Sequence, residues 1–160
     1  MINISPHMAH VTFFGFLTAA AVLLALVEIQ AEGGHGWGEN FPTWRVSNWL
    51  TRLLWGKRPV TGYHLYLNLF VLVLLHFPFA AGFARWSGRL EFRVFAFLVM
   101  LWLLEDFLWF VLNPAFGLHR FKREVVWWHA KNWWGFMPAD YWVAAPLGAW
   151  LYWMSLRGAG

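Results

Sequence analysis

Cysteine is absent from the sequence, and charged residues are scarce. Without cysteine the chain has no disulfide bond, no thiolate metal ligand and no cysteine nucleophile. Asp, Glu, Lys and Arg together make up 12% of the 160 residues, about half of the roughly 25% that is typical of soluble domains. There is no long block of Lys and Arg, so we expect no nucleic acid partner.

Apolar residues, by contrast, make up 60% of the sequence, and aromatic residues 21%, including 14 Trp. A soluble chain of this length has too little interior to bury so much apolar surface. The composition therefore argues against a disordered chain, a coiled coil or a soluble enzyme. We expect residues 1–160 to form a single all-α domain, a polytopic integral membrane protein in contact with membrane lipid.

Four segments are predicted to be transmembrane helices, which need about 20 mostly apolar residues. They cover residues 8–27, 65–84, 94–112 and 139–156. The fourth contains Pro146, which a membrane helix tolerates where its neighbours satisfy the freed carbonyl group. Residues 1–7 contain no Lys or Arg, and the first apolar segment is longer than the core of a signal peptide. We therefore predict that the first segment is a retained helix.

The connection between the first two predicted spans has the pattern of an amphipathic helix. Over residues 46–55 the apolar positions are spaced i, i+3, i+4, i+7 and i+8, which favours a helix lying in the membrane interface. A second short helix or a Trp-rich loop is expected before the fourth span. The apolar positions of the amphipathic segment are Val46, Trp49, Leu50, Leu53 and Leu54.

Four spans would place both chain ends on one side of the membrane, together with residues 85–93; we call this side the terminal face. Residues 28–64 and 113–138 would lie on the other side, the loop face. Four Arg residues belong to the terminal face, and eight Arg and Lys residues to the loop face. By the positive-inside rule, the loop face is predicted to be cytoplasmic and both termini non-cytoplasmic.

Polar side chains gather in the half of the membrane next to the loop face. Glu28 and Glu32 are spaced i, i+4 at the end of the first span and so share a side of the helix. Glu105 precedes the end of the third span by seven residues, which places it roughly 10 Å inside. Ionisable groups inside a bilayer are costly and usually face the bundle interior or a water-filled cavity. The remaining members of this group are His64, Asn68, Asp106, Asn113, His119, His129 and Asp140.

The neighbouring acids Glu105 and Asp106 need a compensating partner. A metal ion is one possibility, because carboxylate and imidazole ligands together suit Fe, Mn or Zn. The Glu-x-x-His spacing of helical di-iron sites is absent, so the ligands would come from separate helices. Protonation of a buried carboxyl group, which would then be a potential general acid, is the second possibility. Ion pairing with loop-face Arg or Lys, a purely structural role, is the third.

The sequence favours a small membrane enzyme, an oxidoreductase or a hydrolase, with a metal-dependent site for an apolar or lipid-like substrate. An Fe, Zn or Mn ion would act as a Lewis acid or a redox centre. Amide side chains near the ligands would orient them. The predicted site residues are His64, Glu105, Asp106 and His129 as metal ligands; Glu28, Glu32 and Asp106 as catalytic groups; Asn68 and Asn113 as orienting groups; and Trp109, Phe110 and Trp128 as cavity walls.

Two other functions fit the same residues. A non-catalytic subunit of a larger membrane complex would use its aromatic surface to pack against a partner, lipid or pigment, and its His residues could ligate a porphyrin. An ion or proton carrier would use Glu105 and Asp106 as a relay. Polar groups are scarce towards the terminal face, where His76 is the main exception, so a continuous path for protons is not evident. A homo-oligomer is compatible with the sequence.

Overall fold

The structure is a computed structural model that describes residues 5–55, 58–129 and 133–157. Within these residues the chain forms α-helices, two short antiparallel strand pairs and one 3-10 turn, η1, at Leu118–Arg120. The helices are α1 (Pro6–Glu32), α2 (Trp49–Trp55), α3 (Gly62–Ala80), α4 (Gly88–Leu112) and α5 (Ala139–Leu156). The strands are β1 (Arg45–Val46), β2 (Val60–Thr61), β3 (Trp133–Trp134) and β4 (Met137–Pro138).

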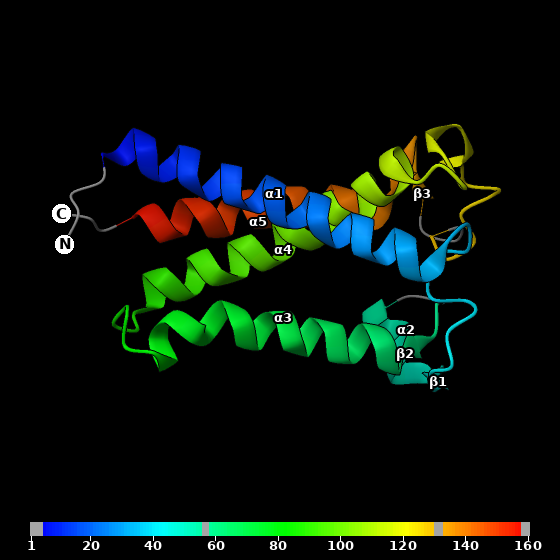
Figure 1. The fold of residues 1–160 in the computed structure, drawn as a ribbon, viewed down its shortest axis with the longest axis horizontal. Helices are drawn as coiled ribbons and strands as arrows, with labels where there is room; N and C mark the ends of the chain where they lie inside the picture. Colours follow the sequence, from blue (N-terminus) through cyan, green and yellow to red (C-terminus); the bar gives the residue numbers. More distant parts are fainter. Residues whose placement is uncertain (1–4, 56–57, 130–132, 158–160) are drawn as a thin grey trace.

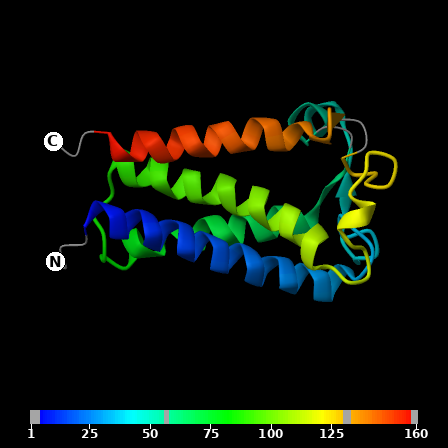
Figure 2. The same cartoon turned by 90° about the horizontal axis from the view of Figure 1, so that it is seen from above.

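The four long helices run side by side, with α4 at the centre (Figures 1 and 2). Helix α4 packs extensively against α1 and α5, whereas its contact with α3 is sparse. The start of α1, the end of α5 and the α3–α4 connection lie at one end of the bundle (Figure 1). The two strand pairs and α2 lie at the opposite end, which is the end predicted as the loop face.

Local sequence signals set the helix boundaries. The side chains of Ser5, Thr61 and Ser87 cap α1, α3 and α4 by accepting a hydrogen bond from a backbone N–H of the first turn. Helix α4 ends at Leu112, and the next residue, Asn113, is extended because Pro114 follows it.

Three helices, α1, α3 and α4, are long and apolar enough to cross a membrane. This supports the expected membrane protein. Helix α5 has the same bounds as the predicted fourth span, but it is not among the helices that reach this apolar character. Trp, Tyr, Pro and Ser interrupt its aliphatic residues, so a fourth span stays a prediction.

The connection before α3 differs from the prediction of a helix over residues 46–55. Val46 lies in β1, whose register pairs it with Val60 of β2, and α2 begins only at Trp49. Asn48 explains this start, because its Oδ1 accepts from the backbone N–H of Thr51 at 2.9 Å while Thr51 Oγ1 accepts from the N–H of Asn48 at 2.8 Å. The predicted first turn of that helix is therefore wrong.

Two further boundaries differ from the sequence prediction. Helix α3 ends at Ala80, and Gly82, with a φ of 74°, adopts the left-handed conformation that commonly terminates a helix. Residues 81–84 of the predicted second span are therefore not helical. In the Trp-rich segment before α5, Trp133 and Trp134 form β3, which pairs with β4, whereas Trp127 and Trp128 lie in a turn.

Small and aromatic residues account for the packing of the bundle. Ala21 and Ala25 of α1 and Ala96 of α4 are fully buried, and small side chains of this kind let two helices approach closely. Towards the loop face the core becomes aromatic and includes Trp109, Phe110, Phe116 and Trp128. Helix α3 buries only Gly62. Its weak packing leaves room for a cavity beside α4 and α5.

Candidate functional site

A cavity of about 660 Å³ near the loop face is lined by residues of α1, α3, α4 and α5. Its inner walls are apolar and come from α4 and α5. Its other end is polar and is covered by the loops that carry Trp37, Arg58 and His129. The apolar wall residues are Val99, Leu103, Val143, Ala144 and Leu147.

Ten of the eleven residues that the sequence predicted for the site line this cavity. The exception is Asn113, whose amide Nδ2 donates to the carbonyl oxygen of Gly33 at 2.7 Å and so fixes the end of α4 against the end of α1. Asn68 lines the cavity but donates to His64 O of its own helix at 2.7 Å. The cavity residues are Glu28, Glu32, His64, Asn68, Glu105, Asp106, Trp109, Phe110, Trp128 and His129; their chemical roles stay predictions.

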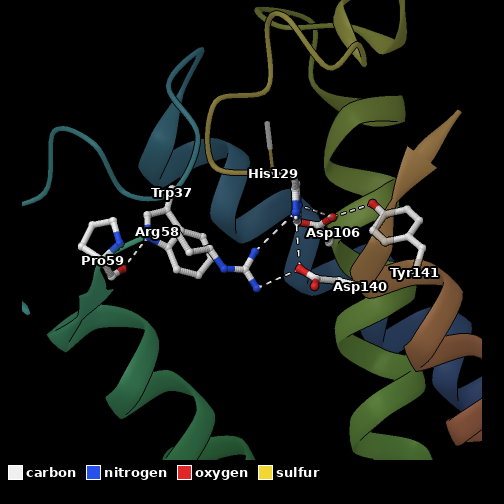
Figure 3. A network of polar contacts seen from close by, with 7 residues as sticks. All are labelled: Trp37, Arg58, Pro59, Asp106, His129, Asp140 and Tyr141. Atoms are coloured by element: carbon white, nitrogen blue, oxygen red, sulfur yellow. Dashed lines mark hydrogen bonds and ion pairs between the residues drawn. The ribbon is translucent and has the colours of Figure 1, made fainter. Parts of the chain in front are cut away.

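His129 lies between two carboxylates (Figure 3). Its Nε2 is 3.3 Å from Asp106 Oδ2, and its Nδ1 is 3.5 Å from Asp140 Oδ2. Arg58 Nη2 lies 3.2 Å from the same Asp140 oxygen. The hydroxyl group of Tyr141 donates to Asp106 Oδ2 at 2.5 Å. We call these five residues the His129 network.

The network favours a positively charged His129. Burial lowers the pKa of this imidazole, and the positive charge of Arg58 lowers it too. The charge of Asp106 and the hydrogen bonds to Asp106 and Asp140 outweigh both effects, so the pKa of His129 lies above its ordinary value of 6.5. With both ring nitrogens facing carboxylates, the charges of His129 and Arg58 offset those of the two aspartates.

Trp37 forms a wall between two cavity side chains. Its indole ring stacks on the ring of His64 at a centroid distance of 4.0 Å, and the Arg58 guanidinium lies 4.3 Å from the indole centroid. Its Nε1 donates to Pro59 O at 2.8 Å. The φ of Trp37 is 59°, a left-handed conformation that is costly for a bulky residue. Gly36 beside it leaves room for Trp128, whose ring a Cβ at this position would meet at 2.2 Å.

Three buried glutamates form a second polar group, which we call the glutamate group: Glu28, Glu32 and Glu105. Glu28 Oε1 accepts from the Tyr63 hydroxyl group at 3.2 Å, and Glu32 accepts from the backbone N–H of Gly38. Glu105 Oε1 has no hydrogen-bond donor within residues 5–55, 58–129 and 133–157. In the part of the chain that the structure describes, no basic nitrogen lies within ion-pair distance of these carboxyl groups.

Unpartnered polar atoms concentrate in the same cavity. Among the described residues, five buried side-chain nitrogen or oxygen atoms lack a hydrogen-bond partner, and four of them belong to cavity side chains. A buried polar atom without a partner costs free energy, so native proteins rarely leave one unsatisfied. The four atoms are Arg58 Nε, Trp102 Nε1, Glu105 Oε1 and Trp109 Nε1.

The predicted metal ligands come together only in part. Asp106 contacts His129, but the Nδ1 of His64 lies 2.6 Å from Thr61 Oγ1, and Glu105 belongs to the other polar group. Over residues 5–55, 58–129 and 133–157, no group of three or more His, Asp or Glu is arranged to hold a metal ion. Metal binding therefore stays a prediction.

Sequence analysis did not single out Trp37, Arg58 or Tyr141 as site residues. Arg58 contributed only to the charge balance of the loop face, and Asp140 was included among the polar residues near that face but not among the predicted site residues. The useful signal was the Asp140–Tyr141 pair at the start of a predicted span, because it lies at the same face as Asp106.

No protein-family model matches the chain, and no curated protein or solved structure is significantly similar to it. The chemistry of the cavity therefore has to be inferred from its own residues.

Proposed function

We propose that the chain is a small integral membrane enzyme that binds a lipid-like substrate in the cavity and acts on the polar end of that substrate. The observation that carries the proposal is the concentration of unpartnered buried polar atoms in one cavity with apolar inner walls. A molecule with an apolar chain and a polar end would satisfy both features. The volume of about 660 Å³ lies within the usual range for small-molecule sites.

Binding would follow the polarity of the cavity. The apolar chain would lie along Val99, Leu103 and Leu147, whose burial by the ligand is favourable. The polar end would meet Arg58 and Glu105 near the loop face. Because α3 packs sparsely against α4, the substrate would reach the cavity from the bilayer beside α3.

Glu105 is the group best suited to exchange a proton with the substrate. It is 4% exposed, and its Oε1 has no hydrogen-bond partner among the residues that the structure describes. Asp106, next to it in α4, is held by His129 and Tyr141, so it would position the site rather than change partners. A buried carboxyl group in an apolar site can hold a proton and serve as a general acid. A bound Fe, Zn or Mn ion would compensate the same carboxyl groups and is the competing explanation.

The proposal includes α5 as a fourth span. Four spans agree with the side-by-side arrangement of α1, α3, α4 and α5 and with the shared end of α1 and α5 (Figure 1). The greater number of basic residues in the loops would then place the polar end of the cavity on the cytoplasmic side.

A non-catalytic lipid-binding subunit is the second candidate. The observation that favours it is the mutual pairing of the His129 network, in which each charged group already has an opposite charge as its partner. Such a network can serve purely to join α4, α5 and the β2 segment.

Lipid turnover tests the proposal. The wild-type chain and Glu105→Gln would be placed in nanodiscs made from a total lipid extract, and the lipids would be followed over time by mass spectrometry. We expect the wild type to consume one lipid species. Glu105→Gln should turn that species over at least about 100-fold more slowly, even where the species is in excess. Glu124→Gln, at an exposed position of the loop face, is the matched control. Lipid binding without turnover would support the subunit instead.

A further inference from the structure

The acidic side chains of the cavity differ in how their charge is balanced. In the His129 network, two aspartates face Arg58 and His129. The glutamate group has no basic partner among the described residues. Among the described residues, a cationic ligand would therefore pair with the glutamates, because the aspartates already have charged partners.

Glu105 indicates which chemical group of a ligand would fit this part of the cavity. It lies on the buried side of α4, where Leu101 and Trp109 are its neighbours one turn away on either side. Its Oε1 is buried without a hydrogen-bond donor in the described part of the chain, although the side chain lines the cavity. A carboxyl oxygen in this position is best satisfied by a group that carries both N–H donors and positive charge.

The aromatic walls of the cavity suit the same group. Trp37, Trp102, Trp109 and Trp128 line it, and the rings of Trp109 and Trp128 meet edge to face at a centroid distance of 6.0 Å and an interplanar angle of 88°. The faces of indole rings attract cations, including alkylammonium groups.

The arrangement of the carboxyl groups favours an ammonium group over a metal ion as the group that they bind. A metal ion needs several ligand atoms at about 2.0–2.2 Å, and no group of three such donors among the described residues is arranged for one. An ammonium group makes hydrogen bonds of about 2.7–3.2 Å and directs them outward to separate acceptors. The acceptors of the glutamate group come from α1 and α4, and such separate acceptors can receive the N–H donors of one ammonium group.

We infer that the molecule bound in the cavity is an amphiphile whose polar end bears an ammonium group, held by the glutamate group with Glu105 at its centre. This inference rests on the proposed function and names the chemical class of its substrate. A single-chain alkylamine and the head group of an aminophospholipid share this chemistry. Arg58 Nε and the indole N–H groups of Trp102 and Trp109 would donate to acceptor oxygens of the ligand, which only the phospholipid supplies.

Native mass spectrometry of the purified chain, released from detergent micelles, tests the inference. The probes are hexadecylamine, hexadecanol and palmitate, which share a chain length and differ in the charge of the polar end. Phosphatidylethanolamine and phosphatidylglycerol distinguish the phospholipid source from the single-chain source. The variants are Glu105→Gln and Glu28→Gln, with Glu124→Gln as the matched control, and circular dichroism establishes that each variant is folded.

We expect hexadecylamine to bind the wild type and Glu124→Gln about tenfold or more tightly than hexadecanol. Glu105→Gln and Glu28→Gln should each reduce this preference while leaving the binding of hexadecanol unchanged. Tighter binding of phosphatidylethanolamine than of phosphatidylglycerol, with the same dependence on Glu105, would assign the phospholipid as the source. Preference for hexadecylamine alone would assign the single-chain amine.

Other outcomes separate the two proposals. Equal binding of all three single-chain probes, or a preference for palmitate, would overturn the ammonium inference and leave the lipid-like substrate standing. An amine preference that survives in both folded glutamate variants would also overturn it. Absence of binding by any probe or phospholipid would overturn the proposed function itself.

Discussion

The Oδ2 atom of Asp106 lies 3.3 Å from Nε2 of His129, which follows it by 23 residues. This contact joins the second half of α4 to the loop that leads into α5. Asp140 approaches the other ring nitrogen of His129, so one imidazole connects α4 with the first turn of α5. The polar end of the cavity is built around this connection.

The charge of His129 makes the stability of the protein depend on pH. The pKa of His129 is raised in the folded state, so its contribution is complete below the unfolded-state pKa and is lost as pH rises through the folded-state pKa. We expect the melting temperature of the wild type in detergent to fall as pH rises above the unfolded-state pKa of about 6.5, and this fall to be smaller in His129→Gln. An equal fall in His129→Gln would assign the pH dependence to other groups.

Removal of the imidazole should also destabilise the protein at neutral pH. His129→Ala leaves Asp106 and Asp140 without their shared partner, at an expected cost of about 2–3 kcal/mol in the free energy of unfolding. His119→Ala, at an exposed position in the same connection, should have little effect. Unfolding followed by tryptophan fluorescence measures both variants, and equal stability of the two would contradict a role for the network in joining α4 and α5.

Glu105 is expected to be required for ligand binding and to lower the stability of the ligand-free protein. Its Oε1 is buried without a donor, so Glu105→Leu removes an unsatisfied polar atom and adds apolar contact. We expect the ligand-free protein to gain about 1–2 kcal/mol of stability. The same change should abolish the preference for an amine ligand. A clear loss of stability in Glu105→Leu would mean that Glu105 has a structural partner.

Gly36 should be needed for the position of Trp128 at the cavity. A Cβ at residue 36 would come within 2.2 Å of the Trp128 ring, whereas a Cβ at Gly34 would meet its nearest neighbour, Ala115, at 3.5 Å. Gly36→Ala should therefore cost about 1–3 kcal/mol of stability and weaken amphiphile binding. Gly34→Ala provides the matched control, since it adds the same methyl group in the same loop without a clash. Equal behaviour of the two variants would contradict this placement of Trp128.

Elemental analysis distinguishes between a metal ion and an ammonium group as the partner of the acidic side chains in the cavity. Protein grown in metal-replete medium and purified without chelator should contain no stoichiometric Fe, Zn or Mn if the glutamate group holds an ammonium group. A stoichiometric metal that is lost in Glu105→Gln but kept in Glu124→Gln would support the metal centre predicted from the sequence and would overturn the ammonium assignment.

The long helices and the convergence of the polar residues were accessible from the sequence. Apolar length defines a span, and helix direction places Glu28, Glu105 and Asp140 at the same end of the bundle. The pairing within that end was not accessible. Arg58, His129 and Asp140 come from three separate segments, and their contacts depend on how the loops fold over the helices.

Some local backbone conformations could not be predicted from the sequence either. An amphipathic spacing cannot show that Val46 pairs with Val60 as a strand, because the alternative partner is distant in the chain. Nor does a run of glycines and Trp show that Trp37 itself, rather than a glycine alone, takes a positive φ. Stacking on His64 and contact with Arg58 hold this conformation in place.

The central claim is that an amphiphile occupies the cavity. Filling the cavity with a larger side chain tests this claim most directly. Ala144 lines the cavity from α5, whereas Ala149 lies at an exposed position of the same helix. Native mass spectrometry of the chain purified in mild detergent should show a bound amphiphile in the wild type and in Ala149→Trp, and its loss in Ala144→Trp. The same bound amphiphile in folded Ala144→Trp, or none in the wild type, would contradict a substrate site between α3, α4 and α5.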